Sequence, residues 1–139
     1  MIKYIFDPGN YPQVINIALL ILRVSIGILM LSHGRDKVLK LFGPRPFQFA
    51  DPMGVGTTAS LSLAIFAEVF CSLLLILGMA TRIALVPLIM TMLMAFFVIY
   101  KGEPFAKKEL PLLYILIYVT LIIAGAGEFS VDSFIFGKL

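Results

Sequence analysis

The sequence predicts an all-α integral membrane protein, a bundle of four transmembrane helices with a proline-rich segment between the first two. Of the 139 residues, 60% are hydrophobic and only 14% are charged, and the mean hydropathy is +1.03. A soluble domain is typically about 45–50% apolar and about 25% charged, so this chain has too little polar surface for a water-soluble globule. The same composition excludes intrinsic disorder and argues against nucleic acid as a partner. We therefore expect the lipid bilayer to surround the chain.

Four apolar stretches are each close to the roughly 20 residues that a helix needs to cross the hydrocarbon core. They cover residues 14–32, 57–80, 83–100 and 110–126. Only Thr81 and Arg82 separate the second stretch from the third, after a break at Gly78, which predicts a tight antiparallel hairpin. No small-x-small cleavage site follows the first stretch, so we expect a retained span rather than a signal peptide. Residues 1–139 are thus expected to form a single membrane domain.

The connection between the first and second stretches has two parts. Residues 33–40 are polar and are predicted to continue the first helix. Residues 41–56 carry three prolines, Pro44, Pro46 and Pro52, among several aromatic side chains. The prolines forbid a regular helix, and the aromatic residues argue against a fully solvated loop. We predict a segment that lies in the headgroup region or re-enters the membrane under cover of protein.

The basic residues outside the apolar stretches predict the orientation of the chain. Seven lie in the first and third loops, namely Arg35, Lys37, Lys40, Arg45, Lys101, Lys107 and Lys108. Three lie at the termini and in the second loop, namely Lys3, Arg82 and Lys138. Because cytoplasmic loops carry an excess of Lys and Arg, both termini are expected to face outward.

Two charged residues stand near the middle of apolar stretches. Arg23 lies in the first stretch and Glu68 in the second. Each costs about 2.5–3.5 kcal/mol at a helix centre, so both are expected to face the bundle interior and to pair with one another. Two interpretations remain open. The pair fixes how two helices meet, or it forms a polar pocket for a polar or redox ligand.

A stripe of polar and small residues follows one face of the first helix. Its polar and flexible members recur every seven residues, at Asn16, Arg23, Met30 and Lys37. Gly27 and Gly34 each lie four residues beyond a member of that series. A face that combines small and polar residues is typical of a helix–helix contact inside a membrane.

Four further residues are candidates for function. His33, the single histidine, is either a proton relay at the membrane surface or a cap on the last carbonyls of the first helix. Cys71, the single cysteine, shares a face with Glu68 and is either a redox-active thiol or an inert buried residue. Arg82 is expected to reach the interface from the hairpin. Glu109, at the start of the fourth stretch, suits a helix N-terminus and has a basic residue such as Lys37 as a possible partner.

The residue counts also limit the cofactors. A single histidine excludes a haem held by two histidines of one chain, and a single cysteine excludes a cysteine-clustered metal site. We assign no metal ligands and no catalytic residues.

These residues, in this order, resemble the DoxX family of small four-helix membrane proteins. The matching pieces are Leu22-Arg23 with Gly27, Ser32-His33-Gly34 with Lys37, Ala67-Glu68-Val69, the hairpin Gly78-Met79-Ala80-Thr81-Arg82, and the ending Gly125-Ala126-Gly127-Glu128-Phe129-Ser130-Val131-Asp132. The ending is similar to the family pattern G-x-G-x-x-S-x-D. The resemblance extends over residues 17–133 and carries the four-span frame with it.

The resemblance implies a redox- or quinone-associated subunit of a bacterial cytoplasmic membrane. The family is named for a subunit of a thiosulfate:quinone oxidoreductase, and other relatives belong to redox or sulfur-stress complexes. Our first hypothesis is that quinone is the ligand and that Arg23, His33, Glu68 and Arg82 form the ligand-binding cluster. Asn16, Lys37, Cys71 and Glu109 would support that cluster.

A non-catalytic alternative also follows from the resemblance, because members of the wider superfamily act as membrane chaperones or cargo receptors. In this alternative the chain is a scaffold, a chaperone or an accessory subunit of a larger complex. Other membrane subunits or further copies of the chain are the expected partners in either case. The sequence has no cofactor-attachment motif, which favours the scaffold, whereas the buried charges favour a ligand site.

Overall fold

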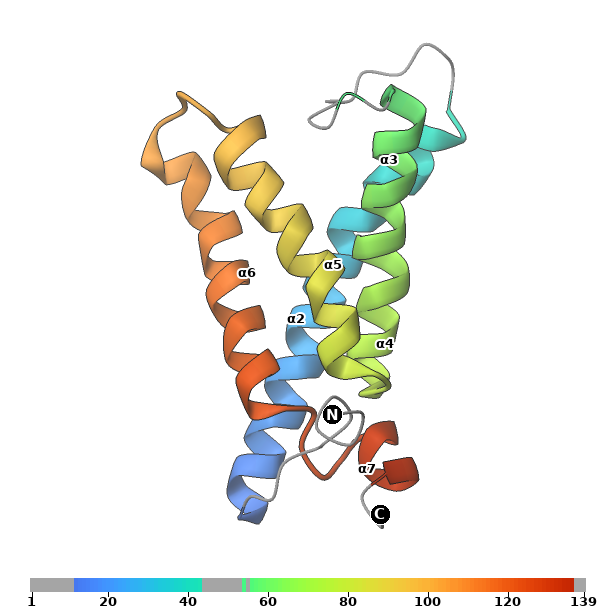
Figure 1. Cartoon of the computed structure of the whole chain (residues 1–139), viewed down its shortest axis with the longest axis vertical. Helices are drawn as coiled ribbons and strands as arrows, with labels where there is room; N and C mark the ends of the chain where they lie inside the picture. The colour runs from blue at the N-terminus through green and yellow to red at the C-terminus, as the bar shows by residue number, and fades with distance from the viewer. Residues whose placement is uncertain (1–11, 44–53, 55, 137–139) are drawn as a thin grey trace.

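A computed structural model describes residues 12–43, 54 and 56–136, and this part of the chain is helical with no strand (Figure 1). The elements in chain order are α2 (Gln13–Leu41), α3 (Thr57–Ile65), the π-helical η1 (Phe66–Cys71), α4 (Ser72–Leu77), α5 (Thr81–Met94), the π-helical η2 (Ala95–Ile99), α6 (Phe105–Ala124) and α7 (Val131–Phe136). α3, η1 and α4 follow one another without a break, as do α5 and η2. The prediction of an all-α fold is confirmed.

Three of the helical rods in the described residues are long and apolar enough to cross a membrane. They are α2 with 29 residues, the α3–η1–α4 rod with 21 and the α5–η2 rod with 19. α6 has 20 residues and lies antiparallel beside α5, but Lys107, Lys108 and Glu109 stand near its start. Length and composition therefore identify three crossing helices, where the sequence predicted four.

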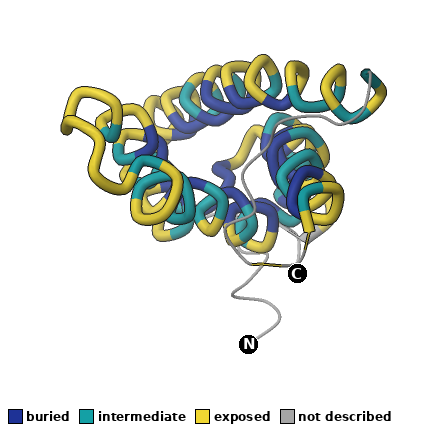
Figure 2. The backbone as a smooth tube through the Cα atoms, turned by 90° about the horizontal axis from the view of Figure 1, so that it is seen from above, coloured by how far each residue is buried: buried dark blue, intermediate teal, exposed yellow. Residues whose placement is uncertain are grey.

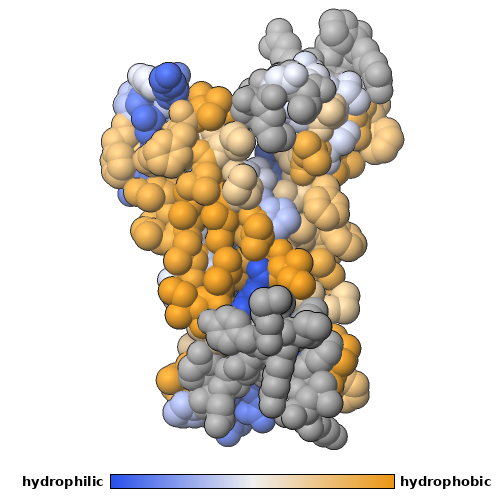
Figure 3. All heavy atoms as spheres, viewed as in Figure 1, coloured by the Kyte–Doolittle hydropathy of each residue, from blue (hydrophilic) through white to orange (hydrophobic). Residues whose placement is uncertain are grey.

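Buried positions lie on the inward sides of the helices and exposed positions on their outward sides (Figure 2), and the face drawn in Figure 3 is mostly hydrophobic over the middle of the bundle. The buried polar residues are Asn16, Arg23, Ser60, Glu68, Ser72, Thr81 and Asp132. The outward faces carry exposed residues such as Ile21 on α2, Phe70 on η1 and Leu116 on α6. An apolar exterior of this extent is stable in lipid and would be an aggregation-prone patch in water. The arrangement therefore supports the membrane environment that the composition predicts.

The small residues of α2 allow a close approach to the second rod. A Cβ atom at Gly27 would lie 2.5 Å from Cγ1 of Ile76, and one at Gly34 would lie 2.7 Å from Cγ2 of Val69. Carbon atoms at such distances overlap, so larger residues here would push the two helices apart. The predicted helix–helix contact along this face is confirmed.

The hairpin between the second and third rods is also confirmed. α4 ends at Leu77, and the next residue, Gly78, has the left-handed backbone that glycine adopts readily (φ 75°). α5 begins three residues after Gly78, at Thr81. Ala80 is also left-handed, with φ 48°. The peptide N–H groups of Ala80 and Thr81, at the start of α5, donate hydrogen bonds to the carboxylate of Asp132 at 2.8 and 3.1 Å. This carboxylate comes from a distant part of the sequence.

The first helix extends beyond its apolar stretch. α2 continues through residues 33–40 to Leu41, which confirms the predicted polar continuation. The proline-rich segment falls largely on residues 44–53 and 55, which lie outside the described residues. Its interfacial or re-entrant course stays a prediction.

Candidate ligand-binding cleft

A cleft of about 770 Å³ opens between the rods at the end of the bundle where α2 ends and α6 begins. In Figure 1 the α5 and α6 pair diverges from α3 toward this end. The cleft extends from Lys40 and Lys107 at the mouth to Met30 and Tyr114 near the middle of their helices. Its walls are mostly apolar with a few polar groups, and its volume falls within the roughly 300–1,000 Å³ of small-molecule sites.

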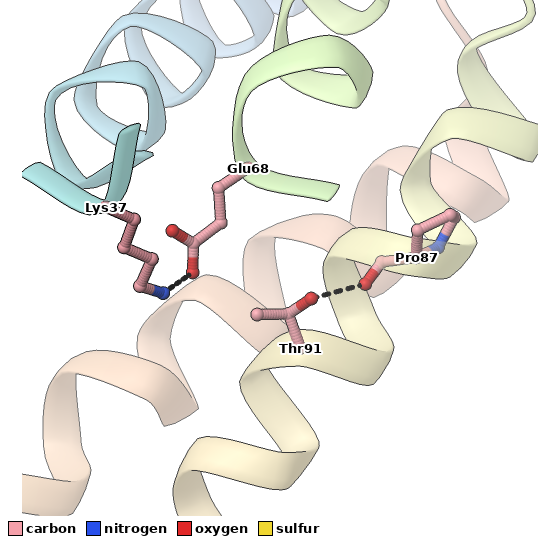
Figure 4. Close-up of polar contacts among 4 residues, drawn as sticks. All are labelled: Lys37, Glu68, Pro87 and Thr91. Atoms are coloured by element: carbon pink, nitrogen blue, oxygen red, sulfur yellow. Dashed lines mark hydrogen bonds and ion pairs between the residues drawn. The ribbon is translucent and has the colours of Figure 1, made fainter. Parts of the chain in front are cut away.

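The main charged group of the cleft is an ion pair between Glu68 of η1 and Lys37 of α2 (Figure 4). Glu68 Oε1 accepts a hydrogen bond from Lys37 Nζ. The Glu68 side chain is 1% exposed and that of Lys37 is 26% exposed. Lys37 therefore compensates a carboxylate that is almost completely removed from solvent.

Two local features bring Glu68 and Lys37 together. Glu68 lies in a π-helical turn, which inserts an extra residue into a helix and is frequent at functional sites. Gly34 lies one turn before Lys37, and a Cβ atom there would be 3.3 Å from Cβ of Glu68. The lack of a side chain at Gly34 thus lets α2 approach η1 closely enough for Lys37 to contact Glu68.

The second carboxylate oxygen of Glu68 differs from the first in its hydrogen bonding. Oε2 is buried and has no hydrogen-bond partner among the described residues. A buried acceptor without a donor costs about 1–3 kcal/mol, and more when the group is charged. Glu68 thus combines one satisfied oxygen and one unsatisfied oxygen in a residue that lines the cleft.

Aromatic residues form another part of the wall. The rings of His33 and Tyr114 of α6 form a T-shaped contact, with centroids 5.9 Å apart and an interplanar angle of 80°. Tyr114 in turn contacts Tyr118 at 5.8 Å. His33 lines the cleft two turns before the end of α2, so the interpretation of His33 as a cap on the last carbonyls of that helix is wrong.

The predicted pairing of Arg23 with Glu68 is wrong. Arg23 donates from Nη1 to the carbonyl oxygen of Ala126 and from Nη2 to that of Phe129, the latter at 2.7 Å. The reason is helix register. α2 and the second rod are antiparallel, and Gly34 lies opposite Glu68, so Arg23 lies opposite the Gly78 turn. A Cβ atom at Gly78 would be only 2.9 Å from Cζ of Arg23.

Arg23 belongs to a second polar cluster at the opposite end of the bundle, which we call the end clamp. It consists of Asn16, Arg23, Arg82 and Asp132. The first three form hydrogen bonds with residues 122–129, and Asp132 accepts hydrogen bonds from the hairpin. Asn16 Nδ2 donates to Glu128 Oε2 at 3.2 Å and its Oδ1 accepts from the Glu128 N–H at 3.1 Å. Arg82 donates to the carbonyl oxygens of Ile122 and Ile123 at 2.8 and 3.3 Å.

The structure thus divides the residues predicted from the sequence into two groups. His33, Lys37 and Glu68 line the cleft, whereas Arg23 and Arg82 do not. Cys71 is buried in the apolar core and Glu109 is exposed on α6. Glu109 falls in the second turn of α6, because that helix begins at Phe105, and Lys37 contacts Glu68 instead.

The cleft also contains polar residues that the sequence does not predict as candidates. Tyr114 and Thr91 line the cleft, yet they are ordinary members of apolar stretches in the sequence. The polar stripe of α2 includes Lys37, but the stripe alone does not identify Lys37 as the partner of Glu68. The seven-residue spacing from Met30 to Lys37 was the available indication, since it places both on the face that lines the cleft.

Comparison with known proteins finds one matching family and one similar protein. The sequence profile of the DoxX family matches residues 18–101, which include Arg23, His33, Lys37 and Glu68. A Haemophilus influenzae protein described as an uncharacterized protein is 32% identical over 124 residues, covering 84% of this chain and 90% of that protein. No solved structure matches the chain.

Proposed function

The chain belongs to the DoxX family and is an integral membrane protein, and from this premise we propose that it is a quinone-associated membrane subunit. In this proposal the cleft holds the head group of a lipid-soluble ligand, and His33, Lys37, Glu68 and Tyr114 are the polar groups that orient it. The observation that carries the proposal is a mostly apolar cleft of ligand size containing a buried ion pair. Buried ionisable groups in membrane helices mark functional sites by default.

The rim of the cleft supports entry from the lipid. Phe66 and Met90 line the cleft, and they are also 49% and 51% exposed on the apolar exterior. A ligand with an apolar tail can therefore leave that tail between α3–η1 and α5, in contact with acyl chains. A ring with oxygen substituents would extend inward, where Lys37, His33 and Tyr114 provide hydrogen-bond donors.

Our proposal includes α6 as a fourth crossing helix and a cleft that opens to the cytoplasm of a bacterial cell. A helix of 20 residues is about 30 Å long, the thickness of the hydrocarbon core, and α6 lies along the full length of α5. Lys40 and Lys107 lie at the mouth of the cleft, and the positive-inside rule assigns that end to the cytoplasm.

Calorimetric titration of the purified protein in nanodiscs with a short-tailed benzoquinone tests this function. The chain has no tryptophan, so calorimetry is preferable to intrinsic fluorescence. We expect saturable binding that is absent from empty nanodiscs. His33→Ala should weaken it about tenfold, and Tyr114→Phe about two- to tenfold, because each removes one hydrogen-bonding group.

Tyr118→Phe is the matched control, because Tyr118 is buried next to Tyr114 but does not line the cleft. Its affinity should equal that of the unsubstituted protein. A flat titration with folded protein would contradict the proposal and favour a non-catalytic scaffold that docks other membrane subunits.

A further inference from the structure

The polar atoms of the cleft are not all donors. Oε2 of Glu68 is buried without a partner among the described residues, while its neighbour Oε1 binds Lys37. As the partner of an ammonium group, Glu68 is a carboxylate, and a carboxylate only accepts hydrogen bonds. The wall of the cleft therefore contains an acceptor that lacks a donor.

The facing wall contributes a second acceptor. Thr91 of α5 lines the cleft and donates its hydroxyl hydrogen to the carbonyl oxygen of Pro87 at 2.9 Å. With its hydrogen used in this way, the oxygen of Thr91 can only accept from a ligand. Figure 4 shows Glu68 and Thr91 on different helices, with the Glu68 carboxylate bound to Lys37 and the Thr91 hydroxyl turned to its own helix.

From these two acceptors we infer that the cleft prefers the reduced, hydroxyl-bearing form of its ligand, a hydroquinone or related phenol, over the oxidised quinone. This inference rests on the proposed function, since it concerns the same cleft. A hydroquinone carries two hydroxyl donors on opposite sides of the ring, one of which pairs with Glu68 Oε2. A quinone carries only carbonyl acceptors. A carbonyl oxygen beside Oε2 cannot donate a hydrogen bond to it, and the two oxygens repel each other.

Because the Glu68 side chain is 1% exposed, a ligand reaches Oε2 only after a side-chain adjustment. Lys37, which binds Oε1, is 26% exposed and has a flexible four-carbon stem that permits such an adjustment. In our inference a ligand hydroxyl donates to Oε2 while Lys37 keeps its contact with Oε1. Preferential binding of the hydroquinone also makes a bound quinone easier to reduce, by about 30 mV for each tenfold difference in affinity of this two-electron couple.

Calorimetry with two matched pairs of probes tests the preference. The first pair is tetramethyl-1,4-hydroquinone and tetramethyl-1,4-benzoquinone, titrated without oxygen. The second pair is 4-hexylphenol and its methyl ether, which differ in the donor but undergo no redox change. We expect the hydroxyl-bearing member of each pair to bind about tenfold more tightly or better, since a hydrogen bond to a charged acceptor is among the stronger ones.

Variants assign the preference to Glu68. Glu68→Gln keeps the shape but replaces one oxygen by an amide donor, so the preference should fall to less than about threefold. Glu109→Gln, on an exposed residue outside the cleft, should keep it. If Glu68→Gln does not fold, the double variant Lys37→Met with Glu68→Leu removes both charges and should bind both members of each pair equally.

The outcomes separate this inference from the proposed function. Equal affinities within both pairs in the unsubstituted protein would overturn the inference and leave quinone binding in place. A preference that survives Glu68→Gln would overturn the assignment to Glu68. Absence of binding by all four probes would overturn the proposed function together with the inference.

Discussion

At the scale of single residues, the two charged side chains near the middle of apolar stretches are buried in different ways. Glu68 binds a second charge, Lys37, beside a cleft, whereas Arg23 binds two carbonyl oxygens of the chain at the opposite end. The sequence predicted that both charges face the interior, because lipid rejects them. It could not predict their partners, because each partner depends on the register of two helices. α2 extends nine residues beyond its apolar stretch, to Leu41, and Lys37 lies in this extension.

The Glu68–Lys37 pair leads to an asymmetric prediction about stability. Lys37→Met leaves a carboxylate that is 1% exposed without its counter-charge, which should cost about 3–5 kcal/mol of unfolding free energy. Glu68→Gln should cost much less, because Lys37 is 26% exposed and can reach the interface. Thermal melts in detergent would measure both.

One further melt checks the cause of that asymmetry. The double variant Lys37→Met with Glu68→Leu should regain most of the stability. Equal losses in the two single variants would show that the ion pair does not set the stability of this region.

At the scale of elements, the hydrophobic pattern predicted the helices and the hairpin, and the small residues of α2 predicted its contact with the second rod. The π-helical turns η1 and η2 were not predicted, because an inserted residue in a long apolar helix leaves no mark on its composition. Residues 125–132, which the end clamp binds, match a family sequence pattern, but the pattern does not predict their contacts. Asp132, for example, binds the start of α5 from 51 and 52 residues away.

Gly78 tests the contact between the hairpin and the end clamp. A Cβ atom there would lie 2.4 Å from Cβ of Ser130 and 2.9 Å from Cζ of Arg23, and the backbone φ is 75°. Gly78→Ala should therefore lower the melting temperature through both strain and overlap. Gly102→Ala is the matched control, because Gly102 also has a positive φ of 81° but would have no neighbour within 4 Å.

Strain alone at Gly102 should cost about 1–2 kcal/mol, and Gly78→Ala should cost clearly more. Losses of the same size would mean that the hairpin does not pack tightly against Ser130 and Arg23.

At the scale of the whole molecule, one end of the bundle is closed and the other is open. Hydrogen bonds of the end clamp connect the hairpin, the first part of α2 and the chain at the end of α6, so the rods lie close together at this end. At the other end they diverge around the cleft (Figure 1). The sequence predicted one polar cluster of Arg23, His33, Glu68 and Arg82, whereas the folded chain distributes these residues between the two ends. Composition could establish that polar groups lie inside but not that they form two separate clusters at opposite ends of the bundle.

The central claim is that the cleft holds a quinone, and the quinone content of protein purified from its membrane in mild detergent tests it most directly. Thr91→Trp places a bulky side chain in the cleft from α5, and Leu116→Trp places the same side chain on the outward surface of α6, where Leu116 is 55% exposed. Solvent extraction and chromatography should find quinone in stoichiometric amount in the unsubstituted protein and in Leu116→Trp, and little in folded Thr91→Trp. The same low content in all three proteins, matching the lipid background, would contradict the claim.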